Sequence, residues 1–315
     1  MLFANPFKLK KLGIMGMNNR NINYIGRLND RKNYPLVDNK LETKKIAELH
    51  NIAVPELLGF IKYQVEVNSF LDYIHGENGF VIKPAQGSGG KGILVILEHE
   101  NGKYIKPSGE ELNDQDIKRH ISNILSGLYS LGGKNDTAVF EKLVDFDDNF
   151  DGFSYEGVPD VRVIVYRGYP ALAMMRLSTS QSDGKANLHQ GAVGVGIDIK
   201  TGKALSAVQF NRPVTNHPDT NKELKTLVVP YWNEILHLCA RCYEMTDMGY
   251  LGADIVIDKQ RGPLVLELNA RPGLAIQIAN DFGALKRFKQ IDKIYGKHNT
   301  IDEKIEFSKT SFLED

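Results

Sequence analysis

Short apolar runs and longer amphipathic stretches alternate along this chain of 315 residues. The runs at 79–84 (GFVIKP) and 92–97 (GILVIL) are typical of buried strands, and a glycine-rich segment joins them. Three stretches, 39–50, 114–131 and 225–245, repeat apolar residues at the helical period. The pattern therefore predicts alternating strands and helices.

The remaining strand signals are one apolar run and two hairpins, at 137–143, 161–177 and 253–268. The first hairpin is expected to turn around Gly168-Tyr169-Pro170, and the second around 259–262. Hairpins interspersed with helices predict an α+β fold built of antiparallel sheets.

Composition excludes several classes of protein. Lys and Arg together number 39, as do Asp and Glu, so the net charge of zero argues against a chain-wide surface for nucleic acid or membrane. No apolar run approaches the roughly 20 residues that span a bilayer, and residues 1–18 lack the apolar core of a secretory signal. The two cysteines cannot build a disulfide framework. We therefore expect a globular enzyme in the cytoplasm.

The two ends of the chain differ from the middle. Residues 1–35 form a basic extension, which either touches an anionic partner or, as we favour, packs on the body through Tyr24, Ile25 and Leu28. Residues 286–315 are polar and are expected to form a peripheral tail. The main domain is then predicted over 36–285.

The glycine-rich segment Gly87-Ser88-Gly89-Gly90-Lys91-Gly92 fits the G-x-G-x-x-G spacing. A dinucleotide site needs a helix after the glycines, and a P-loop needs Ser or Thr after the lysine; this chain continues instead as a strand. The segment is therefore predicted to be a flap whose backbone N–H groups close over phosphates, with Lys83 adding positive charge beside it. A plain glycine hairpin is the alternative.

Carboxylates converge on the last predicted hairpin. Its turn places Asp254 opposite Glu267, and Asn269 shares a strand face with Glu267. Like charges that face each other destabilise a sheet unless something neutralises them, and oxygen ligands of this kind suit Mg²⁺. A solvated acidic hairpin is the alternative, although the strands are apolar.

The first hairpin places Arg162 and Arg176 nearly opposite each other, with Asp160 close by. Two adjacent guanidinium groups repel unless an anion lies beside them, so a phosphate site is one interpretation and solvent-facing arginines are the other. Asn187 and His189 follow in a glycine-rich loop, where a lone histidine is more often structural than catalytic. The C-x-x-C at Cys239–Cys242 is expected to be core packing, because it lies on an apolar helix face.

A lysine on a strand, a glycine flap, an arginine pair and a final D…E-x-N set, in that order, resemble the ATP-grasp superfamily over roughly residues 36–285. Within it the chain looks most like the RimK-like α-L-glutamate ligases. The motifs that carry this likeness are Asp160-Val161-Arg162, Asn187-Leu188-His189, Gly252-Ala253-Asp254-Ile255 and Glu267-Leu268-Asn269-Ala270. The resemblance implies an ATP-grasp fold, in which two α+β subdomains with antiparallel sheets clasp ATP.

The resemblance also implies roles for single residues. Lys40 and Lys83 would contact ATP phosphates, and Gly87, Ser88, Gly89, Gly90, Lys91 and Gly92 would close over them. Glu141, Lys142, Leu143 and Val144 would form the hinge that pairs with adenine, and Asp148, or else Asp147, would suit the ribose. Arg162 and Arg176 would grip the transferred phosphate, while Asp254, Glu267 and Asn269 would hold Mg²⁺ or Mn²⁺. Asn187, His189 and Arg271 would contact substrate.

The chain departs from the family pattern in two places. Only some 39 residues precede Lys40, too few for the usual preATP-grasp domain, so that domain is expected to be missing and glutamate specificity does not carry over. The interval 145–159 is long, acidic and aromatic, as an insertion beside the active site would be.

The expected function is that of an ATP-dependent carboxylate–amine ligase that forms an amide through an acyl phosphate. Its expected partners are small-molecule or peptide acids and amines, without nucleic acid or membrane, and a homo-oligomer is left open. The alternatives are an ATP-grasp phosphotransferase that acts on a hydroxyl and a nucleotide-binding regulator without turnover. The intact Asp254, Glu267 and Asn269 set disfavours the regulator.

Overall fold

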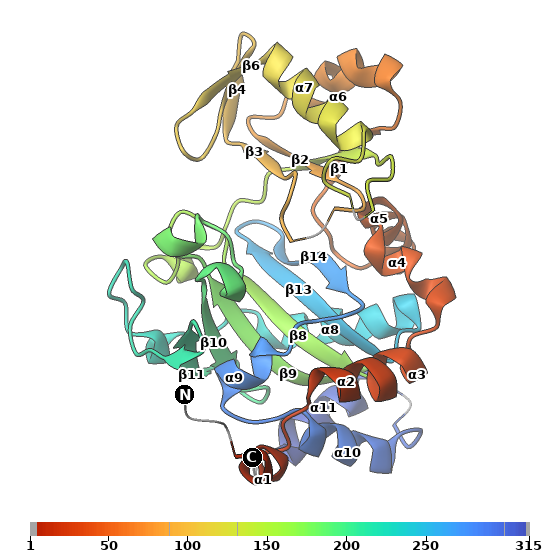
Figure 1. Ribbon diagram of the computed structural model, residues 1–315, viewed down its shortest axis with the longest axis vertical. Coiled ribbons are helices and arrows are strands. Elements are labelled where there is room, and N and C mark those ends of the chain that lie inside the picture. Colours follow the sequence, from red (N-terminus) through yellow and green to blue (C-terminus); the bar gives the residue numbers. More distant parts are fainter. Residues whose placement is uncertain (1–4, 88, 131, 299, 313–315) are drawn as a thin grey trace. The chain divides into compact units, whose positions relative to one another are not determined.

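The computed structural model describes residues 5–87, 89–130, 132–298 and 300–312 (Figure 1). The chain divides into two compact units. Unit 1 consists of Met1–Val37, His50–Ala53 and Phe146–Asp315, and unit 2 of Asp38–Leu49 and Val54–Asp145. Unit 2 is therefore an insertion into the chain of unit 1.

Unit 2 is built on two small antiparallel sheets. The larger has four strands in the order β1 (Leu57–Ile61), β7 (Ala138–Lys142), β2 (Phe80–Pro84) and β3 (Leu94–Ile96). The smaller has three, β4 (Glu98–Glu100), β5 (Lys103–Ile105) and β6 (Glu111–Asn113). Because β2 pairs with both β3 and β7, the predicted strands at 79–84, 92–97 and 137–143 become neighbours in one sheet.

Helices cover these sheets and close the core of unit 2. They are α5 (Lys40–Leu49), η3 (Gln64–Ser69), α6 (Phe70–Ile74) and α7 (Asp114–Leu125). Helix α7 starts at a capping box in which the Asn113 side chain accepts hydrogen bonds from Gln115 N and Asp116 N. Its apolar face buries Ile117, Ile121 and Ile124 in the same cluster as the strand residues Phe80 and Phe140.

Unit 1 contains a seven-stranded antiparallel sheet. Its order is β12 (Arg212–Pro213), β11 (Ala204–Gln209), β10 (Val193–Ile197), β9 (Tyr169–Leu177), β8 (Asp160–Tyr166), β13 (Tyr250–Asp258) and β14 (Gly262–Asn269). The two predicted hairpins, β8–β9 and β13–β14, lie side by side because β8 also pairs with β13. Their charged residues are thereby brought onto neighbouring strands.

Helices pack on the two faces of this sheet (Figure 1). They are α8 (Trp232–Thr246), α9 (Ala275–Asn280), α10 (Leu285–Ile294) and α11 (Ile301–Ser311). Helix α8 contacts β8, β9, β13 and β14, whereas α9 contacts β9, β10 and β11. Ile276 and Ala279 of α9 share a buried cluster with Ile164, Tyr166 and Met174 of the sheet.

The ends of the chain complete that cluster. The N-terminal segment forms α1 (Pro6–Lys11), α2 (Met17–Asn19), η1 (Arg20–Ile25), α3 (Gly26–Leu28), η2 (Arg31–Asn33) and α4 (Pro35–Asp38), and its described residues 5–39 include no strand. Ile25 is buried there, and Tyr24 and Leu28 pack against the cluster, as the favoured interpretation of the basic extension required. Residues 286–315 differ from the expected peripheral tail, because Phe288 and Ile291 are fully buried.

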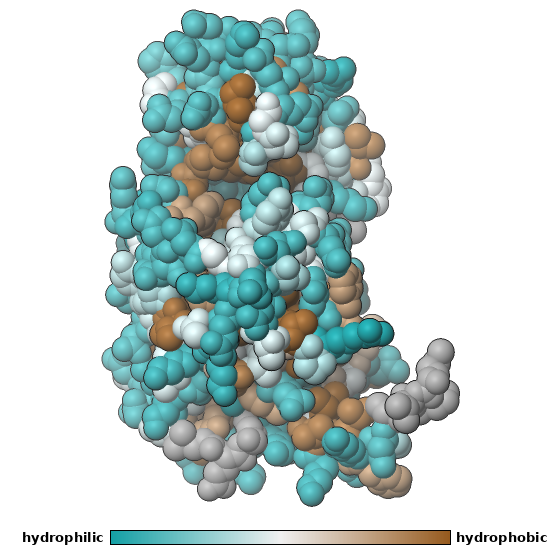
Figure 2. All heavy atoms as spheres, turned by 90° about the vertical axis from the view of Figure 1, so that its left-hand side faces the viewer, coloured by the Kyte–Doolittle hydropathy of each residue, from teal (hydrophilic) through white to brown (hydrophobic). Residues whose placement is uncertain are grey.

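The predicted α+β class with antiparallel sheets is confirmed. The predicted helix 225–245 begins later, at Trp232, because Pro230 disfavours helical geometry at the residue before it and lacks the N–H that a helix interior needs. Residues 224–226 form only a short 3-10 turn, η7 (Leu224–Thr226). Figure 2 shows a face that is mostly hydrophilic, with apolar side chains in separate patches.

Candidate functional site

Four charged side chains meet on the sheet of unit 1. Asp254 of β13 pairs in register with Arg162 of β8, and Asp160 of β8 pairs with Arg176 of β9. The Arg162 guanidinium donates from Nε to Asp254 Oδ1 at 2.7 Å and from Nη2 to Oδ2 at 2.6 Å. Arg176 donates from Nε to Asp160 Oδ1 at 2.7 Å and from Nη2 to Asp254 Oδ2 at 2.8 Å. We call Asp160, Arg162, Arg176 and Asp254 the Arg–Asp network.

The pairing predicted for the two arginines differs from the observed one by two residues. Arg176 lies opposite Asp160, and Arg162 lies opposite Met174. The reason is that the chain turns at Arg167-Gly168, both with positive φ (52° and 84°), one residue earlier than expected. A two-residue turn of this kind fits the twist of a hairpin. Arg162 and Arg176 are nonetheless joined, because both reach Asp254.

Burial and the neighbouring charges together set the protonation of the network. The side chains of Asp254 and Asp160 are only 3% and 5% exposed, and each arginine is 13% exposed. Burial opposes the charged form of Asp254, but Arg162 and Arg176 outweigh it and hold the pKa of this carboxyl below its usual value. For Asp160, burial and the nearby Asp254 charge outweigh Arg176, so its pKa is raised. Asp254 is thus the anionic centre of the network.

The predicted metal ligands lie on the adjoining hairpin. Asp254 pairs with Glu267 in register, as predicted, and the side chain of Asn269 donates from Nδ2 to Asp254 Oδ2 at 3.2 Å. Glu267 and Asn269 are both half-buried. Across the described part of the chain, no group of three or more His, Cys, Asp and Glu residues could hold a metal ion. The predicted set has two carboxylates and depends on an amide as its third member.

The chemistry of this set still fits Mg²⁺. Carboxylate and amide oxygens are the protein ligands that this ion accepts, usually one or two carboxylates completed by water and substrate phosphates. Asp254 already receives hydrogen bonds from two guanidinium groups, so a cation at its oxygens would compete with them.

A second buried charge cluster lies in unit 2. Lys83 of β2 and Lys44 of α5 both approach Glu141 of β7, with Nζ to Oε1 distances of 2.6 Å and 2.9 Å. All three side chains are less than 9% exposed. Burial opposes the ionisation of Glu141, but the two lysines outweigh it and keep its pKa below the usual value. The cluster has two positive charges and one negative charge.

Lys44 was missed from the sequence, although a signal was present. Lys40 and Lys44 are four residues apart on the predicted helix 39–50, so they share one helix face. The Lys40 ammonium donates to Gly87 O at 2.9 Å, which ties α5 to the glycine loop. The helix therefore contributes one lysine to the loop and another to the buried cluster.

The glycine loop joins β2 to β3, as predicted. Gly89, Gly90 and Gly92 have φ values of 65°, 75° and 75°, which favour glycine. A Cβ at Gly89 or Gly90 would meet nothing within 4 Å, so this stretch of backbone lies open. Lys91 is exposed. The predicted Ser88 lies outside the described residues.

The residues predicted to form the hinge and to bind the ribose differ in their contacts and exposure. Lys142 ends β7 and pairs with Glu77 at 3.2 Å, and Leu143 and Val144 follow the strand. Asp147 is buried and caps the turn η4 (Asp148–Phe150) by accepting a hydrogen bond from Asn149 N. The neighbouring Asp148 is exposed and pairs with Lys259 at 2.7 Å. Of the two aspartates, Asp148 is the one with an accessible carboxylate.

The three residues predicted to contact substrate occupy separate settings. Asn187 accepts a hydrogen bond from His189 N at 3.0 Å, so it caps the turn η6 (Leu188–Gln190), on which His189 is exposed. The guanidinium of Arg271 lies over the Tyr34 ring, 4.7 Å from its centroid. The described contacts of Asn187 thus support the loop itself.

The C-x-x-C pair is core packing, as expected. Cys239 and Cys242 are free, fully buried thiols on α8. Burial raises the pKa of Cys242 to about 12, and it raises the pKa of Cys239 as well. Neither thiol is available as a nucleophile or metal ligand near neutral pH.

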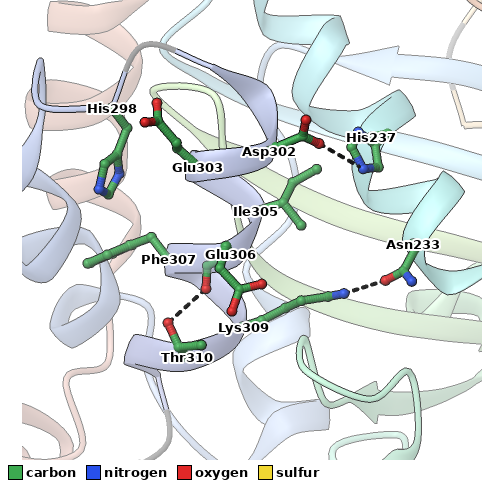
Figure 3. Close-up of a pocket in the computed structure, with 10 residues that line it drawn as sticks. All are labelled: Asn233, His237, His298, Asp302, Glu303, Ile305, Glu306, Phe307, Lys309 and Thr310. Carbon is green, nitrogen blue, oxygen red and sulfur yellow. Dashed lines mark hydrogen bonds and ion pairs between the residues drawn. The ribbon is translucent and has the colours of Figure 1, made fainter.

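Unit 1 also has a pocket of about 780 Å³ between α8 and α11 (Figure 3). His237 lies 3.4 Å from Asp302, and Lys309 donates to Asn233 across the pocket. Its lining is polar and charged apart from Ile305 and Phe307. None of the residues predicted for the site lines it.

The model of a family described as sugar-transfer associated ATP-grasp matches residues 19–293. No curated protein sequence matches the chain.

Among solved structures, the ATP-grasp ligase PsnB complexed with a minimal precursor is 14% identical over 81% of this chain and 58% of its own, with a TM-score of 0.42. D-alanyl-alanine synthetase A from Vibrio cholerae is 11% identical over 89% of this chain and 65% of its own, with a TM-score of 0.47. A RimK domain ATP-grasp protein from Sphaerobacter thermophilus is 13% identical over 80% and 69%, with a TM-score of 0.42. The chain thus spans less than two thirds of the first two proteins.

Proposed function

Because the chain belongs to the sugar-transfer associated ATP-grasp family, we propose that it is an ATP-dependent ligase that joins a carboxylate to an amine. The ATP-grasp superfamily that the motifs predicted is confirmed by this membership. In the proposed reaction, the substrate carboxylate attacks the γ-phosphorus of ATP and ADP leaves. The amine then attacks the acyl phosphate, and inorganic phosphate leaves as the amide forms.

The Arg–Asp network is the observation that carries this proposal. Two guanidinium groups are held on adjacent strands by bidentate and shared hydrogen bonds to buried carboxylates. Groups fixed in this way do not need to reorganise when charge develops on a phosphoryl group beside them. Arg162 and Arg176 are therefore proposed to steady the acyl phosphate.

The residues of unit 2 are proposed to bind the nucleotide. The cluster of Lys44, Lys83 and Glu141 has an excess positive charge, and open glycine backbone lies in the neighbouring loop that Lys40 contacts. Phosphate oxygens accept hydrogen bonds from ammonium and backbone N–H groups. Lys83, Lys40 and the glycine loop are thus proposed as phosphate contacts, with Lys44 as an addition.

Metal binding is proposed at the β13–β14 hairpin. Glu267 and Asn269, with Asp254 beside them, would hold Mg²⁺, whose two positive charges would offset the negative charge of anionic substrate oxygens. The Arg–Asp network alone is neutral if both aspartates are ionised, so a bound cation strengthens attraction for the substrate anions. This charge balance favours a magnesium-dependent enzyme.

An amine is proposed as the nucleophile rather than a hydroxyl. Arginine cannot accept a proton, so Arg162 and Arg176 cannot activate an alcohol. A deprotonated amine attacks an acyl phosphate with less assistance. The family description adds one restriction, since it associates these proteins with sugar transfer. Sugar acids and amino sugars therefore belong among the first substrates to test, together with amino acids and peptides.

The test begins with purified protein, ATP and Mg²⁺, and a panel of those acids and amines, with ADP release and product mass as readouts. Once a pair is found, the carboxylate is labelled with ¹⁸O. The acyl-phosphate route transfers one labelled oxygen to inorganic phosphate. Unlabelled phosphate together with a phosphorylated product would contradict the ligase assignment and favour the alternative, a phosphotransferase.

A matched pair of variants locates the chemistry. Arg176→Lys keeps the charge but removes the bidentate geometry, so ADP release coupled to amide formation should fall at least tenfold. Arg119→Lys makes the same change on α7, where the side chain is 70% exposed, and should leave the rate unchanged. Equal rates for both variants would exclude Arg176 from the reaction.

A further inference from the structure

Positive charge is concentrated in the N-terminal segment of unit 1, although the chain as a whole is neutral. We call residues 5–32 the basic segment. Its charged residues are Lys8, Lys10, Lys11, Arg20, Arg27, Arg31 and Lys32, against a single acid, Asp30. The excess of six positive charges is balanced by the rest of the chain, whose net charge is negative. The neutral total therefore includes a segment with a strong local excess of positive charge.

Helix α1 at the start of this segment contributes no buried residue to the core. None of the residues of α1 is buried, and Phe7 and Leu9 are 82% and 37% exposed. A six-residue helix has little stability of its own in water, because nucleation is unfavourable. The structure thus exposes an aromatic ring on a helix that the protein core does not use.

Apolar and basic side chains alternate on the surface of the basic segment. Lys10 and Lys11 follow Phe7 by three and four residues, so they flank its ring on the same helix face. Met17 and Ile22 are also exposed, at 63% and 64%. Aliphatic and aromatic side chains interspersed with basic ones are typical of segments that lie in a membrane interface. There the methylene chains of lysines lie against apolar groups, and their ammonium groups extend to the water and the lipid headgroups.

The end of α1 is fixed to the body of unit 1. Gly283 N donates to Leu12 O and Leu285 N donates to Gly13 O, each at 3.0 Å. This contact places α1 beside the start of α10, and the side chain of Lys286 lies within 3.1 Å of where a Cβ on Gly13 would be. The basic surface is therefore continued by α10.

We propose that the basic segment docks unit 1 on an anionic lipid surface. Charge alone would suit a nucleic acid or an acidic protein equally well, but exposed Phe7, Met17 and Ile22 add apolar area that a phosphate backbone does not use. Charge and inserted apolar side chains together supply the two signals that stable peripheral binding needs. No helix among the described residues is long and apolar enough to cross a membrane.

The experiment is co-sedimentation of the full chain with vesicles. One set is phosphatidylcholine alone, and the other contains roughly one third phosphatidylglycerol. Binding is expected only to the anionic vesicles, and it should be lost when the salt is raised from about 50 mM to about 500 mM, because screening shortens the range of the attraction. Equal binding to both vesicle types would overturn the proposal.

Variants separate the two signals. Replacing Lys8, Lys10 and Lys11 by glutamine should weaken binding to anionic vesicles on the order of 100-fold. Phe7→Ser should weaken it about tenfold without changing its dependence on salt. These side chains are exposed, so the melting temperature should not change.

A control variant carries the same loss of charge elsewhere. Lys45, Lys103 and Lys185 are 54%, 65% and 48% exposed, and their replacement by glutamine should leave vesicle binding at the wild-type level. If the two triple variants weakened vesicle binding equally, the binding would depend on net charge alone. That result would refute the proposal that the basic segment is the binding surface. Binding to polyuridylic acid without binding to anionic vesicles would refute the lipid partner in favour of nucleic acid.

Discussion

Replacing Glu141 by glutamine removes a carboxylate that two buried ammonium groups contact. The change keeps the shape of the side chain but leaves Lys44 and Lys83 facing an uncharged amide. Their Nζ atoms lie 2.9 Å and 2.6 Å from Glu141 Oε1, and their side chains are only 8% and 5% exposed. Loss of one partner from a buried ion pair costs about 3–5 kcal/mol of stability, because a charge remains in a poorly solvated place. We expect Glu141→Gln to lower the free energy of unfolding by this amount.

A second variant tests the cause of that loss. Adding Lys44→Met to Glu141→Gln removes one of the two buried charges while keeping an apolar stem. We expect the double variant to regain about 1–2 kcal/mol over Glu141→Gln alone. Glu111→Gln is the matched control, since Glu111 pairs with Lys103 where both are more than half exposed, and it should change stability by less than about 0.5 kcal/mol.

The assay is urea unfolding of the full chain, followed by far-UV circular dichroism. The only tryptophan, Trp232, lies in unit 1, so its fluorescence reports on unit 1 separately. Because the lysines lower the pKa of Glu141, its charge stabilises the fold above the ordinary glutamate pKa of about 4.3. This contribution is lost as the pH falls through the lowered pKa. A Glu141→Gln variant with the wild-type urea midpoint at neutral pH would refute the reasoning.

Three further predictions follow from single residues. Glu267→Gln should abolish ADP release and remove the Mg²⁺ dependence of stabilisation by ATP. The stability of the protein without ligands should be unchanged or higher, because repulsion between Glu267 and the facing carboxylate of Asp254 is relieved. Wild-type turnover would exclude Glu267 from the metal site. Arg261 and backbone N–H groups outweigh burial and lower the pKa of Asp258 to about 2, so its charge stabilises the fold above about pH 4 and this stability is lost toward pH 2. The difference in stability between wild type and Asp258→Asn should accordingly shrink as the pH falls from 4 to 2. Cys239 and Cys242 should not react with a thiol reagent in the native state and should both react in denaturant, because both are fully buried.

The hairpins could be predicted because short-range signals define them. The β13–β14 turn follows from the glycine at 262, and it brings Asp254 opposite Glu267 as expected. The β8–β9 register could not be derived in the same way, because the turn at Arg167-Gly168, in place of Gly168-Tyr169-Pro170, accompanies a pairing in which Arg162 faces Met174, two residues from the expected Arg176. The pairing of β8 with β13 joins segments some ninety residues apart, and nothing local encodes it.

The buried charge cluster of unit 2 also depends on contacts between distant segments that the local sequence does not encode. A lysine on a helix is expected to face solvent, since most lysines do. Lys44 is buried because β7 places a carboxylate within its reach, and that strand lies almost a hundred residues further along the chain. The sequence gives the helix face on which Lys44 lies, but only the assembled unit shows what it meets.

The insertion of unit 2 into the chain of unit 1 has a consequence for folding during synthesis. Unit 2 is nearly contiguous, so it can form once residue 145 has left the ribosome. The N-terminal segment must wait far longer, because Asn29 bonds to the backbone of Tyr250 and Ala270, more than two hundred residues later. Contacts of such sequence separation form slowly. A nascent chain therefore carries its first helices exposed until the last strands of the large sheet are made, and this is the interval in which it most needs a chaperone.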